Sequence, residues 1–165
     1  MESHAKLLGH PGHTILIVFP LGLLATSVIF DIVYLFNDNS TMAVVAFWMQ
    51  VAGIVGGLIA APFGTIDWFA ISKGTRAKRI GLVHGLGNVV VLLLFTISAL
   101  FRWDEVETPP TLALIASFAG FALAGFTGWL GGELVDRLGV GVDPGAHLDA
   151  PNSLSGRAAM EGRRL

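Results

Sequence analysis

The stretch MAVVAFWMQVAGIVGGLIAAPF, residues 42–63, decides the fold class, because it is long, apolar and free of charged side chains. A helix needs about 20 mainly apolar residues to cross the hydrocarbon core of a bilayer. Three more stretches reach this length, at residues 14–36, 80–101 and 110–135. They are continuous, whereas the strands of a membrane β-barrel alternate over about ten residues. Since lipid cannot satisfy open backbone groups, the sequence predicts an all-α bundle of four transmembrane helices.

The composition of the whole chain agrees with a membrane domain. Of its 165 residues, 53% are hydrophobic and only 13% are charged, whereas a soluble domain has about 25% charged residues. The net charge of -2 provides no basic field for nucleic acid. The absence of cysteine excludes disulfides, thiolate metal sites and cysteine nucleophiles. The first apolar stretch is longer than the roughly 7–15 residues of a signal-peptide core, so we expect a retained helix.

The predicted helices divide the chain into an N-terminal segment, residues 1–13, a membrane domain, residues 14–135, and a tail, residues 136–165. Basic side chains gather in the loop 64–79 and in both terminal segments: Lys73, Arg76, Lys78, Arg79, Lys6, Arg137, Arg157, Arg163 and Arg164. Because cytoplasmic loops carry an excess of Lys and Arg, we expect both termini and the middle loop in the cytoplasm. Arg102 belongs to the opposite end, where we expect its long side chain to snorkel to the interface.

Glycine and proline modify two of the predicted helices. The fourth helix ends in a dense run of small residues, Gly125, Gly128, Gly131 and Gly132. Small residues let helix backbones approach closely in lipid, so we expect this run to form a contact face. Pro20 lies within the first helix and is expected to kink it.

Ionisable side chains at membrane depth are costly and are candidates for function. Asp31 lies in the first helix, about a turn and a half from its outer end, where we expect a structural partner or interfacial solvation. His84 lies about one turn inside the third helix, and Asn88 shares its face four residues later. We therefore expect the side chains of His84 and Asn88 to point into the bundle.

The expected orientation brings an imidazole or a carboxylate from every helix to the cytoplasmic side: His10, His13, Asp67, His84 and Glu133. Three interpretations of this set are open. His13 and His84, with Asn88 nearby, have the residue type for axial ligands of haem b. All five residues could instead bind a divalent metal through nitrogen and oxygen. The third interpretation is a hydrogen-bond network that ties helix ends together without a ligand.

Motifs of common enzyme classes are missing from the sequence. It has no GxSxG, no Walker loop and no GxGxxG at a strand-to-helix turn. The sequence therefore leaves any catalytic residues unassigned, and on balance it does not indicate an enzyme.

Three ordered blocks resemble one protein family: GHPGHTILIVFPLGLL, GLIAAPFGTIDWFAISKGTRAKRIGLVHGLGN and GGELVDRLGVGVDPGAHLDAPNSLSG. Through these blocks the chain resembles the bacterial family called domain of unknown function 2231 over roughly residues 10–156. The resemblance implies a four-helix protein of the bacterial inner membrane. Some relatives are joined to cytochrome c-type or Rieske iron–sulfur domains, and this association implies a redox setting.

These observations lead to one main hypothesis and two alternatives. The main hypothesis is a redox-associated inner-membrane protein with a histidine site on the cytoplasmic side, holding haem b or a metal. Its partners would be the lipid bilayer, a redox protein or membrane complex, and further copies of the chain. One alternative is a non-enzymatic scaffold or accessory subunit without a cofactor. The other is a small transporter or proton pathway through Asp31, His84 and Asn88, although no inverted repeat is evident.

Overall fold

The computed structural model describes residues 1–161, so Arg163 and Arg164 lie outside the described part. Within it, the α-helices are α1 (Gly12–Leu16), α2 (Val18–Asn37), α3 (Ser40–Ala70), α4 (Arg76–Phe101) and α5 (Thr111–Gly132). A single π-helical stretch, η1 (Glu133–Arg137), continues α5. Four helical spans of the described chain are long and apolar enough to cross a membrane: Gly12–Asn37, Ser40–Ala70, Arg76–Phe101 and Thr111–Arg137. The predicted all-α, four-span fold is confirmed.

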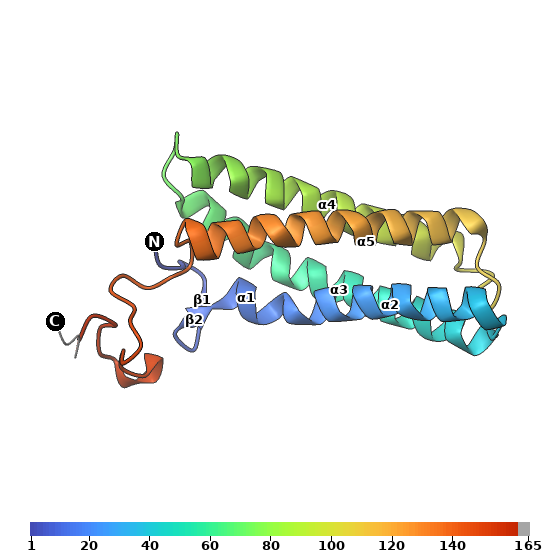
Figure 1. Ribbon diagram of the computed structural model, residues 1–165, viewed down its shortest axis with the longest axis horizontal. Coiled ribbons are helices and arrows are strands. Elements are labelled where there is room, and N and C mark those ends of the chain that lie inside the picture. Colours follow the sequence, from blue (N-terminus) through green and yellow to red (C-terminus); the bar gives the residue numbers. More distant parts are fainter. Residues whose placement is uncertain (162–165) are drawn as a thin grey trace.

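The helices form two hairpins that lie side by side (Figure 1). In the first hairpin α1 and α2 pack against α3, and in the second hairpin α4 packs against α5. We call the surface where the two hairpins meet the inter-hairpin interface. The basic end of the bundle carries the N-terminal segment, residues 71–75 and the tail, and the acidic end carries residues 38–39 and 102–110.

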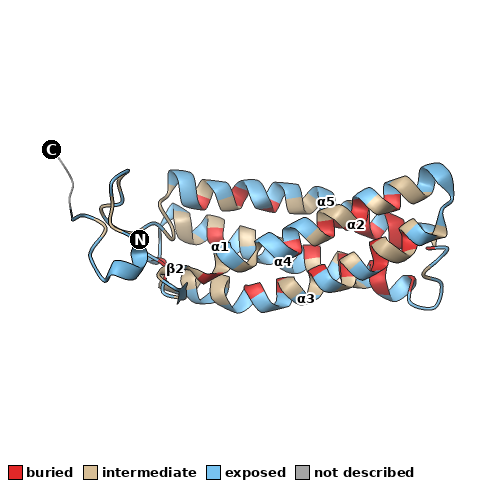
Figure 2. Ribbon diagram, turned by 90° about the horizontal axis from the view of Figure 1, so that it is seen from below, coloured by how far each residue is buried: buried red, intermediate tan, exposed pale blue. Residues whose placement is uncertain are grey.

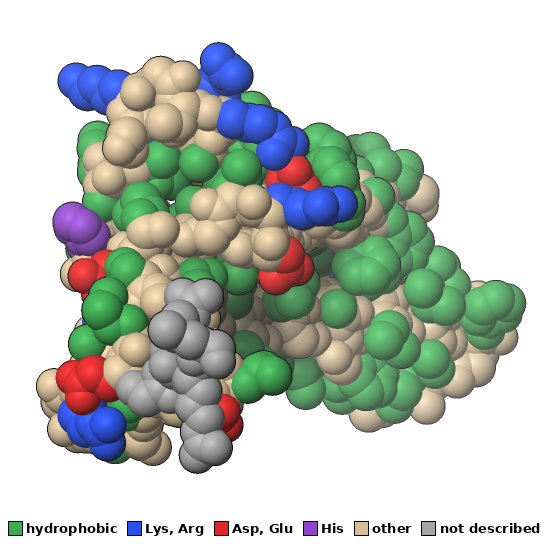
Figure 3. Space-filling view, turned by 60° about the vertical axis from the view of Figure 1, so that its left-hand side comes forward, with side chains coloured by type: hydrophobic (Ala, Val, Ile, Leu, Met, Phe, Trp, Pro, Cys, Tyr) green, Lys and Arg blue, Asp and Glu red, His purple; other side chains and the backbone are tan. Residues whose placement is uncertain are grey.

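The surface of the bundle suits a lipid environment. Large apolar side chains point outward from several helices, including Phe19, Leu58 and Leu86, and each is more than half exposed. Lys and Arg side chains gather at the basic end, and the flank behind them is mainly hydrophobic (Figure 3). A contiguous apolar surface of this kind marks contact with lipid or protein rather than with water.

Pro20 interrupts the first span one turn before its own position. Ile17 separates α1 from α2, and Pro20 lacks the backbone N–H that would donate to the carbonyl of Leu16. Pro20 itself lies in the first turn of α2. Backbone N–H groups there have no partner within the helix, so proline costs α2 no hydrogen bond of its own. The predicted disturbance is therefore present, displaced toward the N-terminus.

The boundary predicted between the second and third helices is wrong. We expected a helix over 42–63 and a loop over 64–79, but α3 continues through Pro62 to Ala70 and only residues 71–75 connect it to α4. The hydroxyl of Thr75 accepts from the backbone N–H of Lys78 at 3.1 Å and so begins α4 early. The Lys78 ammonium lies 4.0 Å above the Trp68 ring, which joins the two helix ends.

The glycine run at the end of α5 is only partly a contact face. A Cβ added to Gly131 would lie 3.2 Å from the ring of His84, so this residue does allow close packing. A Cβ on Gly125 or Gly128 would meet no atom within 4 Å, so the predicted contact is wrong at these two positions. Their spacing alone could not show which side of the helix faces protein.

Buried residues concentrate toward the acidic end (Figure 2). The cluster formed by Leu24, Val28, Val91 and Phe95 joins both hairpins there. Toward the basic end His13, Ile17, His84 and Asn88 are only half-buried. The hairpins are therefore packed most tightly at one end.

The N-terminal segment and the tail cover the basic end together. Strands β1 (Lys6–Leu7) and β2 (His10–Pro11) form a small antiparallel pair, and positive φ angles at Leu8 and Gly9 make its two-residue turn. Lys6 reaches the tail, where its ammonium lies 2.7 Å from the carboxylate of Asp143. This bond, and a second one to Glu2, raise the pKa of Lys6 above its usual value. A short helical turn, η2 (Ser153–Ser155), lies further along the tail.

Candidate functional site

His13 and His84 lie opposite one another on the inter-hairpin interface. His13 comes from α1 in the first hairpin, and His84 comes from α4 in the second. Their ring centroids are 6.4 Å apart and the two ring planes are nearly perpendicular, at 87°. Of the five residues predicted to form a site, these two are brought together, and we call them the histidine pair.

A backbone carbonyl of the neighbouring helix holds each imidazole. Nδ1 of His13 donates to the carbonyl oxygen of Ala60 at 3.1 Å, and Nδ1 of His84 donates to that of Thr127 at 2.9 Å. A carbonyl oxygen can only accept, so Nδ1 carries the proton in both rings. In the neutral imidazole this leaves the lone pair on Nε2, the nitrogen through which a histidine held in this way binds a metal.

Local backbone packing explains the position of His13. The residue before it, Gly12, is buried, and a Cβ there would lie 2.5 Å from the Phe63 ring. The N–H of Gly12 also donates to the carbonyl oxygen of Ala5 at 2.7 Å. Only glycine lets α1 begin this close to α3, and this approach puts His13 within reach of Ala60.

Asn88 joins the site through His84. Its Nδ2 amide lies 3.1 Å from Nε2 of His84, and its Oδ1 accepts from the hydroxyl of Thr127 at 2.9 Å. These bonds agree with a neutral His84 whose Nε2 is an acceptor. The expectation that His84 and Asn88 point into the bundle is therefore met, and Asn88 occupies the ring nitrogen that a ligand would need.

The other predicted site residues are bound elsewhere. His10 is exposed, and its Nε2 lies 3.2 Å from the hydroxyl of Ser153 in the tail. Asp67 accepts from the hydroxyl of Ser3 at 2.7 and 2.8 Å, and from the backbone N–H groups of His4 and Ala5. Asp67 therefore fastens the N-terminal segment to the end of α3, and neither residue reaches the histidine pair.

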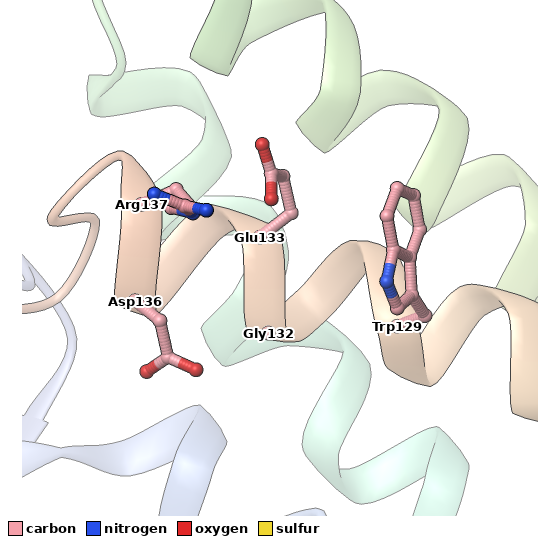
Figure 4. Close-up of a pocket in the computed structure, with 5 residues that line it drawn as sticks. All are labelled: Trp129, Gly132, Glu133, Asp136 and Arg137. Atoms are coloured by element: carbon pink, nitrogen blue, oxygen red, sulfur yellow. The ribbon is translucent and has the colours of Figure 1, made fainter.

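Glu133 also has a partner outside the histidine pair. Its carboxylate lies 2.6 Å from the guanidinium of Arg76, which ties the end of α5 to the start of α4. Asp136 lines the same shallow hollow as Glu133, but the two carboxylates point to opposite sides of the helix (Figure 4). Over residues 1–161, no group of three or more His, Asp or Glu side chains is arranged to hold a metal ion. The five-residue metal site predicted from the sequence does not form.

A second polar cluster, which the sequence did not predict, lies near the acidic end. Asp31 of α2 and Arg102, directly after α4, form a bidentate ion pair with N–O distances of 2.9 and 3.1 Å. Both side chains are completely buried. The predicted snorkelling of Arg102 to the interface is therefore wrong, because the carboxylate draws the guanidinium inward.

Polar side chains of three helices surround this ion pair. Ser98 accepts from the guanidinium at 3.2 Å, and the hydroxyl of Ser117 lies 3.3 Å from the Asp31 carboxylate. Gln50 donates to the backbone carbonyl of Phe95 nearby. Among the described residues Nε of Arg102 is buried without a partner. We call Asp31, Arg102, Ser98 and Ser117 the ion-pair cluster.

The ion pair could have been predicted from two opposite charges at the same end of two predicted spans. Asp31 lies near the outer end of the first span and Arg102 ends the third. A buried charge normally requires an opposite partner, so each residue could have been assigned to the other.

The comparisons with known proteins identify the class of this chain. The family described as "Predicted membrane protein (DUF2231)" matches residues 9–144. The chain therefore belongs to that family, as the three sequence blocks indicated. No curated protein and no solved structure matches the chain.

Proposed function

We propose that this protein is a redox-associated membrane protein that holds haem b between His13 and His84. The observation that carries the proposal is the opposed histidine pair. Nδ1 of each ring is fixed by a backbone carbonyl of its own hairpin. Two such imidazoles have the donor type that would hold the iron of a haem.

The distance between the rings supports this assignment. Bonds from imidazole nitrogen to a metal are about 2.0–2.1 Å long, so two imidazoles that held one ion would have centroids no more than about 6 Å apart. The observed separation of 6.4 Å is close to that limit. Both rings are half-buried, so the surrounding helices do not enclose them completely.

The residues of this chain would bind and orient the cofactor. The carbonyl oxygens of Ala60 and Thr127 fix the ring tautomers and increase the basicity of Nε2. Asn88 would release Nε2 of His84 when iron binds, because one lone pair cannot serve both. When bound, haem supplies one-electron transfer.

The basic end is proposed to face the cytoplasm. The positive-inside rule supports this, since Lys73, Arg76, Lys78 and Arg79 all lie at that end. In a bacterial inner membrane the histidine pair would then lie near the cytoplasmic interface. An electron partner would approach there, where the N-terminal segment and the tail cover the bundle.

An absorption spectrum of the protein purified after expression with supplied haem tests the proposal. We expect a Soret band that disappears in His13→Ala and in His84→Ala. His10→Ala is the matched control and should keep the band, because His10 is bonded to Ser153 and lies outside the site. A wild-type protein without a Soret band would refute the haem assignment.

The alternative is a membrane scaffold or accessory subunit without a cofactor. It is favoured by the bonds that Asn88 and Thr127 already make to His84. It predicts no Soret band and no bound metal by elemental analysis. In that case His13→Ala and His84→Ala lower only the thermal stability.

A further inference from the structure

The residues that meet across the inter-hairpin interface stand in a regular relation along the chain. Arg102 follows its partner Asp31 by 71 residues. His84 follows His13 by the same interval. The two polar sites therefore each consist of one position on α1 or α2 and the position 71 residues later.

The contacts that hold the histidines are repeated between the hairpins. His13 bonds to the carbonyl of Ala60 in α3, and its ring would be 2.9 Å from a Cβ on Gly64, one turn further on. His84 bonds to the carbonyl of Thr127 in α5, and its ring would be 3.2 Å from a Cβ on Gly131, again one turn further on. The same histidine, carbonyl and glycine arrangement is built twice.

The helix contacts deeper in the bundle repeat as well. In the first hairpin, a Cβ on Gly53 would lie 2.7 Å from the side chain of Leu24. In the second, a Cβ on Gly120 would lie 3.0 Å from the ring of Phe95. Phe95 follows Leu24 by 71 residues. In α5 the interval from α3 is 67 residues, from Gly53 to Gly120 as from Gly64 to Gly131.

Burial follows the same two intervals. Every buried residue of α2 has a buried counterpart in α4 or directly after it: Pro20 and Val91, Leu24 and Phe95, Ser27 and Ser98, Val28 and Ala99, Asp31 and Arg102. Buried residues of α3 mostly match those of α5: Ala46 and Ala113, Phe47 and Leu114, Gln50 and Ser117, Gly53 and Gly120, Ala60 and Thr127. The intervals differ by four residues, close to one helical turn.

From these relations we infer that the chain is a duplicated two-helix hairpin, and that Asp31 and Arg102 determine which hairpins pair. Both copies start at the basic end, so the axis that relates them runs along the membrane normal, as in parallel repeats. Equivalent positions touch one another only on such an axis. The histidine pair and the ion pair therefore mark the axis at two depths.

The two axial sites differ in one respect. The histidines are identical in both copies, whereas the other axial position is Asp in the first copy and Arg in the second. Pairing of two first hairpins would bring Asp31 against Asp31, and pairing of two second hairpins would bring Arg102 against Arg102. Like charges in a buried site are unfavourable, so the interface accepts only one hairpin of each kind. The first hairpin therefore pairs with a second hairpin and not with another first hairpin.

A charge swap in the full-length protein tests this inference. In Asp31→Arg or Arg102→Asp two like charges meet on the axis, and we expect loss of the monodisperse peak in detergent. The double variant restores an ion pair in the reverse sense. If the positions are equivalent, its melting temperature should return to within about 5 °C of the wild type. A double variant as unstable as the single ones would overturn the inference.

The serines around the ion pair separate true equivalence from simple charge compensation. In the wild type Ser98, one turn before Arg102, bonds to the guanidinium, whereas Ser27 bonds only to the carbonyl of Leu24. Ser98→Ala should therefore lower the melting temperature more than Ser27→Ala. In the swapped protein Arg replaces Asp31 and lies one turn after Ser27, so the larger decrease should move to Ser27→Ala. A larger decrease that stays at Ser98 would overturn the inference, even if the swapped protein is stable.

Discussion

The ion-pair cluster and the histidine pair lie on the same interface but differ in charge, burial and bonding. Asp31 and Arg102 are charged, completely buried and bonded to each other. His13 and His84 are half-buried, and they bond to backbone carbonyls rather than to each other. The first site holds the hairpins together, whereas the second places two imidazole rings opposite one another, with their centroids 6.4 Å apart.

Burial explains why the two sites differ. An unpaired charge in a membrane interior is costly, so a buried Asp or Arg must keep its partner in every state of the protein. A neutral imidazole can exchange a hydrogen bond for a metal without exposing a charge. The proposed haem binding would therefore take place at the basic end without separating a buried ion pair.

Removing one partner of the ion pair should have the largest effect. Arg102→Ala leaves the Asp31 carboxylate buried without its counter-charge, so we expect a loss of about 3–5 kcal/mol in the free energy of unfolding. Reversible unfolding in mixed detergent micelles measures this loss. Lys73→Ala removes the same charge from an exposed position and should leave the stability unchanged; equal losses in both variants would contradict the assigned role of the ion pair.

Removing a member of the histidine pair should have a smaller effect on stability. Without ligand, His84→Ala loses hydrogen bonds between neutral groups, which corresponds to about 1–3 kcal/mol. The same unfolding measurement, carried out on protein without haem, gives the comparison. A loss as large as that of Arg102→Ala would mean that the histidines, too, act chiefly as a structural clamp.

Asn88→Ala should show whether Asn88 competes with haem for His84 or supports haem binding. It removes the amide that competes for Nε2 of His84, while the Thr127 hydroxyl keeps its bond to the carbonyl of Ala124. Since one neutral hydrogen bond is worth about 0.5–1.5 kcal/mol, haem affinity should rise by up to about tenfold. Haem titration followed at the Soret band measures it, and weaker binding would show that Asn88 supports the ligand instead.

The smallest effect is expected at the partly exposed ion pair of the basic end. Glu133→Ala breaks the bond to Arg76, whose side chain is 55% exposed, so the change in stability should be below about 1 kcal/mol. Bound haem should not change either, because Glu133 lies outside the histidine pair. Loss of the Soret band in this variant would show that Glu133 contributes to haem binding.

Sequence reasoning found the histidine pair but overstated the cluster around it. His84 was recognisable because a histidine and an asparagine four residues apart share one helix face at membrane depth. His10, Asp67 and Glu133 lie at the same end of the molecule, but side chains at one level can point in any direction around the bundle. The bonds of Asp67 to Ser3 and of Glu133 to Arg76 depend on how the chain ends fold back.

The internal repeat was also hidden in the sequence. Only scattered positions are identical between the copies, such as His13 and His84 or Ser27 and Ser98. The interval also changes by four residues between the first and the second helix of the hairpin, so no single offset aligns both. The repeat becomes visible through burial and through contacts on the axis.

The sequence by itself determined that this chain forms four membrane-spanning helices. Span length and hydropathy are local properties, and lipid leaves the backbone of such a segment no alternative to a helix. Only the tertiary structure decided which polar side chains meet. That choice depends on the rotation of each helix about its own axis and on the pairing of the hairpins, which place Asp31 against Arg102 and His13 opposite His84.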